Sequence, residues 1–166
     1  MDNAFLFRMF EHNNWANEKM IEFCGNLSKG QLDVNPKSTT RGSIRQTLVH
    51  LVRAQHGYLE LLTIPSGARR AISPSYSELA NLANSSGEGL LDYLRDEAVA
   101  DEQGRLETSD GYFVAPWVVL VQVIQHAAEH REQLSSMLTD LGLDPPDLDG
   151  WSFGESRSAV VPMRRE

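Results

Sequence analysis

The pattern of apolar and polar positions along the chain predicts a protein built from helices. Four segments repeat apolar side chains at alternating spacings of three and four, which is the mark of an amphipathic helix. They run roughly over residues 4–24, 43–63, 75–96 and 116–141. Ser43 with Gln46 and Ser75 with Glu78 form capping boxes, and Pro116 suits a first helical turn. The pattern therefore predicts an all-α fold, a four-helix bundle.

The segments between and after these helices have other patterns. Residues 103–115 hold short alternating stretches around Asp110-Gly111, which predicts a small β-hairpin between the third and fourth helices. Residues 28–42 and 65–74 are interpreted as connections. Beyond Leu141 the chain is rich in Pro, Asp and Gly; we expect Trp151 and Phe153 to hold part of this tail on the bundle and the last ten residues to be mobile. Residues 1–166 are expected to form a single domain.

Composition and charge narrow the classes of function. The net charge is −8 and no cluster of Lys and Arg offsets it, which disfavours binding to nucleic acid. The single cysteine, Cys24, excludes an intrachain disulfide. The chain shows neither a signal peptide nor an apolar run long enough to span a membrane, so we expect a cytoplasmic protein without membrane contact.

The sharpest chemical signal is the pair His126 and His130. Positions four apart lie on one face of a helix, so two imidazoles there can chelate one metal ion. The apolar stripe that includes Val123, Ala127 and Leu134 contains His130 and borders His126, which points both rings toward the bundle interior. Two core histidines satisfied by hydrogen bonds are the alternative, but facing imidazoles desolvate each other unless a cation joins them.

A third ligand is predicted on the second helix. His50 lies on a stripe of small side chains that includes Thr47, Ala54 and Gly57, which leaves room beside it. Close helix packing would also explain these small residues. His56 is turned about 120° from His50, at ~100° per residue, and is expected to be solvated. His12 shares a boundary face with Trp15 and has only a minor chance of approaching the site.

Three asparagines on the first helix, Asn13, Asn14 and Asn17, are unusual, because Asn competes for the helix backbone. Asn13 lies within the apolar stripe and Asn17 follows one turn later. A buried amide needs partners. Two interpretations stay open: these side chains cap a neighbouring loop, or they line a polar pocket around the metal.

Three pieces of the sequence, in this order and spacing, resemble the DinB/YfiT-like family of bacterial bundle proteins. They are Asn14-Trp15-Ala16-Asn17-Glu18, Thr47-Leu-Val-His50-Leu and His126-Ala-Ala-Glu-His130-Arg131-Glu-Gln133. The likeness covers nearly the whole chain. It implies a four-helix fold in which His50, His126 and His130 hold a metal ion, often zinc or nickel, and it implies frequent homodimers. Glu132 stands where this family commonly has Gly, and we expect it to face solvent.

The resemblance also implies an activity. Characterised relatives include thiol-dependent transferases and isomerases that use bacillithiol, mycothiol or glutathione. The first hypothesis is therefore a metal-dependent transferase that adds a low-molecular-weight thiol to a small electrophilic substrate, with Asn13 or Asn17 orienting it. A small-molecule metallohydrolase with Glu129 as base is the second, since His126-Ala-Ala-Glu-His130 matches the inverted zinc-protease motif. The third is a non-catalytic metal- or ligand-binding dimer used in stress response.

A homodimer is also predicted from the residues themselves. Phe5, Phe7 and Phe10 place aromatic side chains around the first helix beyond what one buried stripe requires. Exposed apolar surface of this kind often marks an interface. Cover by the C-terminal segment is the alternative explanation.

Overall fold

The computed structural model describes residues 4–35, 42–95 and 104–163. Its body consists of the long helices α1 (Ala4–Gly25), α3 (Ile44–Thr63), α4 (Leu79–Arg95) and α5 (Pro116–Asp140). The shorter elements are α2 (Lys29–Asp33), η1 (Ser66–Ala68), η2 (Tyr76–Glu78), β1 (Leu106–Glu107), β2 (Phe113–Val114) and α6 (Gly150–Ser156). The predicted all-α four-helix bundle with one short hairpin is confirmed.

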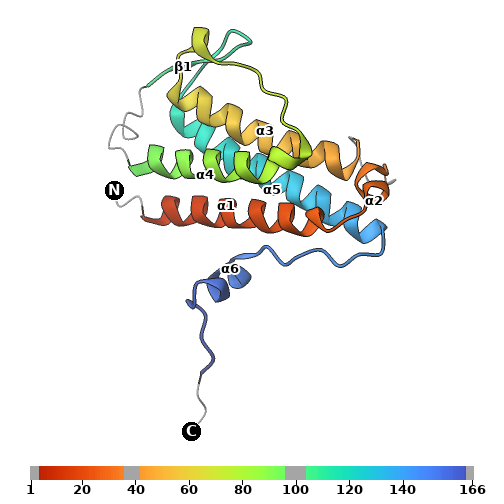
Figure 1. Ribbon diagram of the computed structural model, residues 1–166. Helices are drawn as coiled ribbons and strands as arrows, with labels where there is room; N and C mark the ends of the chain where they lie inside the picture. The colour runs from red at the N-terminus through yellow and green to blue at the C-terminus, as the bar shows by residue number, and fades with distance from the viewer. Residues whose placement is uncertain (1–3, 36–41, 96–103, 164–166) are drawn as a thin grey trace.

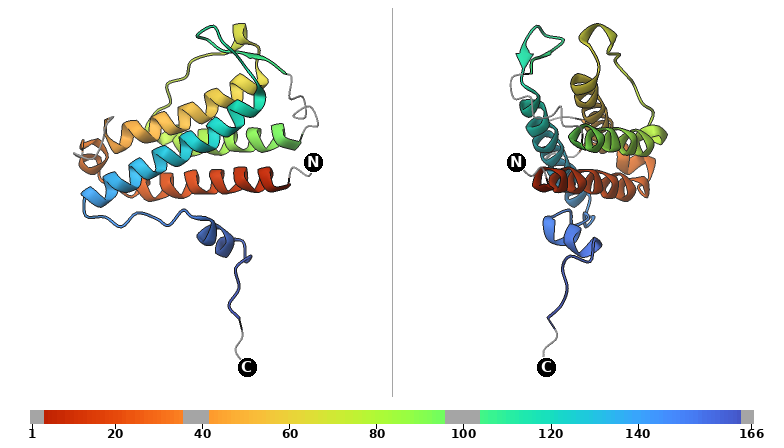
Figure 2. Two further views of the ribbon diagram at one scale, coloured as in Figure 1. Left: turned by 180° about the vertical axis from the view of Figure 1, so that it is seen from behind. Right: turned by 90° about the vertical axis from the view of Figure 1, so that its left-hand side faces the viewer.

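The four long helices pack as a ring. Helices α1 and α3 each contact both α4 and α5 (Figure 1). The hairpin and the segment that holds η1 lie together at one end of α3, and α6 lies beside α1 on the other side of the bundle (Figure 2). None of the described helices has the length and apolar character needed to cross a membrane.

Local signals fix the ends of these helices. The Ser43 side chain accepts a hydrogen bond from the Gln46 amide, as a capping box requires. The box at Ser75 also forms, although its first turn is the 3₁₀ helix η2. Helix α5 has Pro116 in its first turn and is followed by Gly142, whose φ of +73° is the left-handed conformation typical of a helix end. The third predicted helix extends to residue 96, which lies outside the described residues.

The core consists of two apolar halves with a polar layer between them. One half lies toward α2 and includes Met20, Leu48 and Leu134. The other lies toward the hairpin and includes Phe10 and Leu90. Between them each long helix contributes a buried polar side chain: Asn13, Asn17, Gln55, Ser86 and Arg131.

The hairpin is a two-stranded antiparallel sheet in which Leu106 pairs with Val114. Gly111 has a φ of +89° in its turn, a conformation that L residues rarely adopt. Arg69 fastens the hairpin to α3, because its guanidinium donates to the carbonyls of Ile64 and Glu107. The hairpin therefore has a fixed position over the C-terminal half of α3.

Two short helices depart from the sequence interpretation. Residues 29–33 lie in a predicted connection but form α2, which buries Leu32. Residues 150–156 form α6 within the predicted irregular tail. As expected, Phe153 contacts the bundle, with its ring 5.4 Å from that of Trp15. Trp151, in contrast, is 72% exposed.

Candidate metal centre

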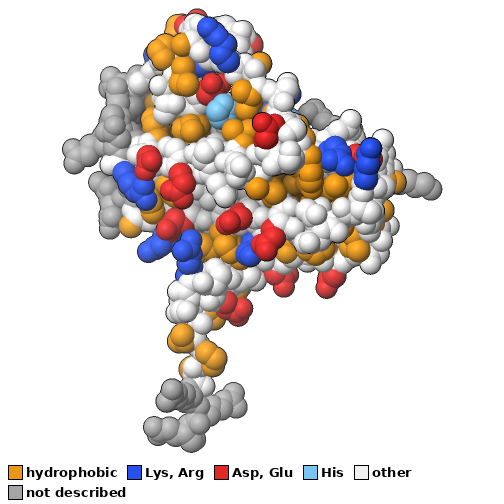
Figure 3. All heavy atoms as spheres, viewed as in Figure 1, with side chains coloured by type: hydrophobic (Ala, Val, Ile, Leu, Met, Phe, Trp, Pro, Cys, Tyr) orange, Lys and Arg blue, Asp and Glu red, His pale blue; other side chains and the backbone are white. Residues whose placement is uncertain are grey.

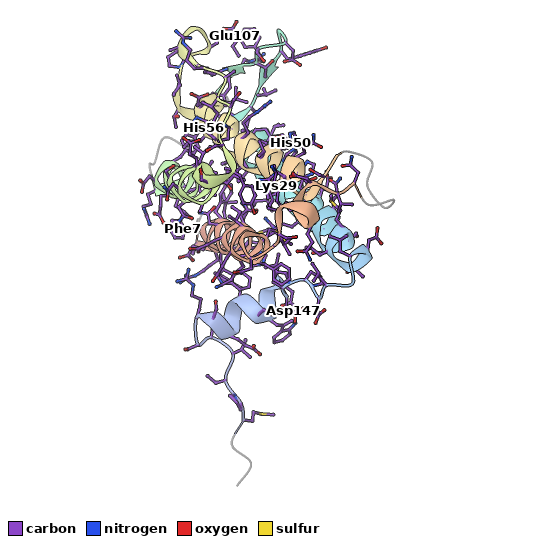
Figure 4. All side chains as sticks on the ribbon, turned by 45° about the vertical axis from the view of Figure 1, so that its right-hand side comes forward. Phe7, Lys29, His50, His56, Glu107 and Asp147 are labelled. Atoms are coloured by element: carbon purple, nitrogen blue, oxygen red, sulfur yellow. The ribbon has the colours of Figure 1, made fainter. Side chains whose placement is uncertain are left out.

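Three histidine side chains meet where α3 and α5 lie side by side. His50 projects from α3 (Figure 4). His126 and His130 lie one turn apart on α5. His126 Nε2 lies 3.1 Å from His50 Nε2 and 3.2 Å from His130 Nε2. All three rings are half-buried. These three side chains could therefore hold one metal ion.

The spacing of the nitrogens fits a shared ion. Two ligands at ~2.0 Å from one tetrahedral zinc ion lie about 3.3 Å apart, close to both observed distances. A neutral imidazole keeps a lone pair on one ring nitrogen, and that lone pair can bind a metal ion. The donor set, three imidazoles without thiolate or carboxylate, suits zinc and nickel alike.

Gln133 orients one of the three rings. Its Oε1 atom lies 3.0 Å from Nδ1 of His130. An amide oxygen only accepts, so the contact is a hydrogen bond when Nδ1 carries the ring proton, and that tautomer leaves the lone pair of Nε2 for a metal ion. Histidines that ligate metals ordinarily donate their second ring N–H in this way. Gln133 belongs to the sequence motif quoted above, but the motif alone did not reveal its role. The role follows from its contact with His130, three residues earlier on α5.

Two cavities lie beside the histidines. The larger has a volume of about 580 Å³ and is lined by His50 and His126 together with residues of α3, the segment after it and the hairpin turn. The smaller, of about 230 Å³, is lined by His50 and His130 with Gly42, Gln46, Thr47 and Gln133. The larger volume lies within the ~300–1,000 Å³ range of small-molecule sites.

The small residues of α3 form one wall of the larger cavity. Ala54 and Gly57 line it next to His50, as the predicted room beside that histidine requires. The prediction that the histidine rings face the bundle interior was wrong in one respect. The lining includes no described residue of α1 or α4, so the cavity lies on the outer side of the α3–α5 pair and not in the bundle interior.

Comparison with known proteins identifies the family of the chain. The sequence profile of the DinB family matches residues 1–162. The chain belongs to the DinB family. No curated protein matches it.

Solved structures of similar fold carry the same family name. A protein described as a member of the DinB family from Exiguobacterium sibiricum 255-15 is 22% identical, with a TM-score of 0.70 over 90% of this chain and 99% of its own. A DinB-like protein of Bacillus subtilis is 15% identical, with a TM-score of 0.63 over 86% and 98%. At these identities the likeness shows the shared DinB fold.

The two other histidines considered from the sequence lie outside the triad. His56 is less exposed than predicted: its side chain is 24% exposed, lines the larger cavity and lies 3.8 Å from Glu60. The segment after α3 folds back over this part of the helix, which a helical wheel does not reveal. His12 lies on the tail side of this DinB bundle, where its Nε2 is 2.7 Å from the Leu148 carbonyl oxygen.

Asn13 and Asn17 do not line either cavity. Both are buried in the core, where Arg131 Nη1 donates to their Oδ1 atoms at 2.9 and 2.6 Å. Asn17 in turn donates to Gln55, which donates to the Ala83 carbonyl and to Ser86. Both interpretations offered from the sequence, a loop cap and a pocket wall, are therefore wrong. The partner that explains these amides is Arg131, more than 100 residues away in the sequence.

Two further groups are placed away from the cavities. Glu129 is exposed on α5 and lines neither cavity, so it does not face the histidines as a base would. Glu132 is exposed, as expected. Cys24 is fully buried, and burial raises the pKa of its thiol to about 12.

Proposed function

We propose that this DinB-family protein is a divalent-metal-dependent S-transferase that adds a low-molecular-weight thiol to a small electrophilic substrate. His50, His126 and His130 are the proposed metal ligands, and zinc or nickel is the proposed ion. The observation that carries the proposal is the convergence of three Nε2 atoms at the wall of a cavity of about 580 Å³.

The number of protein ligands favours a catalytic metal site over a purely structural one. Structural zinc sites are usually closed by four protein ligands, whereas three protein ligands leave a position for water or substrate. When bound, the ion supplies Lewis acidity that lowers the pKa of a coordinating thiol or water. His50 and His126 border the cavity, so a substrate in it would lie against the site.

The thiol is proposed to come from outside the chain. Cys24 is the only cysteine, is fully buried between α1 and the core, and has a pKa raised far above neutrality. The reactive form of a thiol is the thiolate, so Cys24 is not a suitable nucleophile. A free thiol in the cavity, positioned by its walls beside the histidines, meets the requirement.

The metallohydrolase alternative has less support. Its proposed base, Glu129, is exposed and outside both cavities. The non-catalytic alternative, a metal- or ligand-binding protein used in stress response, predicts bound metal without turnover, and the experiment below distinguishes it.

A homodimer and a cytoplasmic location remain proposals. Of the three phenylalanines on which the dimer was predicted, Phe10 is fully buried and Phe7 is half-buried beneath Arg95. The larger exposed aromatic surface lies on the hairpin and the start of α5, on Phe113 and Trp117. Light scattering at micromolar concentration should give twice 18.6 kDa; a mass of 18.6 kDa would contradict the dimer.

The proposed function is tested by purifying the untagged protein without a chelating column and measuring its metal content. The metal-loaded protein is then assayed with glutathione, bacillithiol and mycothiol against an aryl chloride and an epoxide. Metal-dependent loss of thiol in the parent, and none in His126→Ala, is the expected result. One equivalent of metal without turnover with any thiol would favour the non-catalytic alternative.

A further inference from the structure

The larger cavity differs in charge from the chain that contains it. The chain as a whole has a net charge of −8. The cavity is lined by three arginines, Arg53, Arg69 and Arg70, and by a single carboxylate, that of Glu60. On the face drawn in Figure 3, basic side chains lie at the top of the molecule and also at its left and right sides, with acidic side chains among them. It is the lining of the cavity itself in which arginines outnumber carboxylates.

Two of these arginines have guanidinium groups available to a ligand. Arg53 is exposed on α3, and Arg70 is exposed in the segment after η1, where one of its nitrogens donates to two backbone carbonyls. Among the described residues neither forms an ion pair. Glu60 forms no ion pair with either arginine in the described part of the chain; its carboxylate lies 3.8 Å from Nε2 of His56.

Arg69 has a different task. Its nitrogens donate to the carbonyls of Leu61, Ile64 and Glu107, which are the free carbonyls at the end of α3 and one on the hairpin. A cation at this end of a helix is stabilised by the helix dipole. Arg69 therefore holds the cavity wall together and adds to its positive potential, while three of its five N–H donors are already used by backbone carbonyls.

We propose that Arg53 and Arg70 select a substrate bearing a carboxylate or another anionic group, whose charged end lies at the cavity mouth and whose reactive end lies beside His50 and His126. The inference rests on the proposed function for the identity of the reactive end. The anionic preference itself follows from the arginines: guanidinium binds carboxylate through paired, charge-assisted hydrogen bonds. The hairpin turn, with Thr108 and Ser109, completes the wall between the two ends.

Matched pairs of probes test the charge preference by binding alone. The electrophile pair is 4-chloro-3-nitrobenzoate and 4-chloro-3-nitrobenzamide; the thiol pair is 3-mercaptopropionate and 3-mercaptopropionamide. Each probe is titrated singly by calorimetry, so no turnover is needed. The variants are Arg53→Gln with Arg70→Gln as the double change, and Arg8→Gln as a control that removes one exposed positive charge on α1, away from the cavity. His126→Ala removes a proposed metal ligand.

At least one carboxylate probe is expected to bind roughly tenfold more tightly than its amide. The ratio should fall toward one in the double variant and at high salt, and it should persist in Arg8→Gln and in His126→Ala. Which pair shows the ratio tells whether the electrophile or the thiol carries the charge. Equal affinities within both pairs would overturn the inference. It would also be overturned if His126→Ala abolished the affinity ratio and the double arginine variant kept it, because the metal ion would then be the anion-binding site. A persistent ratio without thiol transfer would contradict the proposed function alone.

Discussion

His130 and Arg131 are neighbours on α5, yet their side chains belong to two polar clusters with opposite properties. Arg131 points into the core, is 7% exposed, and shares hydrogen bonds with Asn13 and Asn17. Among the described residues, only Nδ2 of Asn13 lacks a partner in that cluster. His130 is half-buried and points toward the outer side of the α3–α5 pair. Its Nε2 atom lies 3.2 Å from Nε2 of His126.

This difference distinguishes a polar cluster that stabilises the fold, around Arg131, from one that is suited to bind a ligand, around His130. Apart from Asn13 Nδ2, the core cluster pairs its donors and acceptors within the chain, as a buried polar layer must. Burial lowers the pKa of Arg131 to about 10, and no ion pair accompanies it among the described residues. The histidine cluster instead brings three imidazole nitrogens together beside a cavity, an arrangement that could hold a metal ion.

The largest effect is expected when one proposed ligand is removed. Loss of an outer hydrogen-bond partner of a metal ligand already weakens binding ~10–100-fold, so His50→Ala, His126→Ala or His130→Ala should each weaken it by at least about 100-fold. Competition with a chromophoric chelator measures the affinity. His56→Ala is the matched control and should change it little, since that ring lies outside the triad. If His50→Ala bound metal as tightly as the parent, or if His56→Ala abolished binding, the proposed ligand set would be wrong.

The core cluster should respond in stability instead. Arg131→Met leaves the Oδ1 atoms of Asn13 and Asn17 buried without their donor, and each such group costs about 1–3 kcal/mol. We therefore expect the free energy of unfolding to fall by about 2–5 kcal/mol in the metal-free protein. Urea denaturation followed by circular dichroism measures it. The neighbouring Glu132→Gln, on an exposed side chain, should stay within ~0.5 kcal/mol. Equal stability of Arg131→Met and the parent would contradict a structural role for the cluster.

Gln133 allows the outer layer of the histidine cluster to be tested. Gln133→Leu removes the oxygen that accepts the Nδ1 proton of His130, so metal affinity should fall ~10–100-fold. Gln133→Glu keeps an accepting oxygen and should retain most of the affinity. Chelator competition again supplies the measurement, with the melting temperature of the metal-free forms as a check on folding. Weaker binding by Gln133→Glu than by Gln133→Leu would show that the oxygen does not orient the ring.

The smallest effect concerns Cys24, which belongs with the buried core. Its pKa is raised to about 12 by burial, so the thiol stays protonated from neutral pH through about pH 10 in the folded protein. Ellman's reagent at pH 8 should react slowly with the native protein and reach one equivalent in denaturant. Rapid reaction of the native protein would return Cys24 to consideration as a nucleophile.

The sequence predicted the elements that periodicity can reveal and missed those that it cannot. Helices α1, α3 and α5 are long enough for the spacing of apolar residues to show. Helix α2 has 5 residues and α6 has 7, which is too short for that signal. Capping residues could have found both: Ser28 forms a capping box with Gln31, and Asp149 accepts from the Ser152 amide.

The contacts of the histidines and asparagines show the same difference: those within one helix could be predicted, and most of those between distant segments could not. The pairing of His126 with His130 depends on one helical turn and could be predicted. His50 could be added to this pair because it lies on the stripe of small side chains of its own helix, and neighbouring helices pack through such stripes. The partners of Asn13 and Asn17 could not be predicted, since they depend on which residue of α5 faces α1. The cover over His56 depends on the path of a loop.

X-ray absorption at the metal edge of the protein purified with its own metal is the most direct test of the proposed centre. We predict an inner shell of nitrogen or oxygen at ~2.0–2.1 Å with the outer-shell scattering of three imidazoles, and its loss in His126→Ala. A sulfur shell at ~2.3 Å, or a shell of oxygen without imidazole scattering, would contradict a metal centre built from His50, His126 and His130.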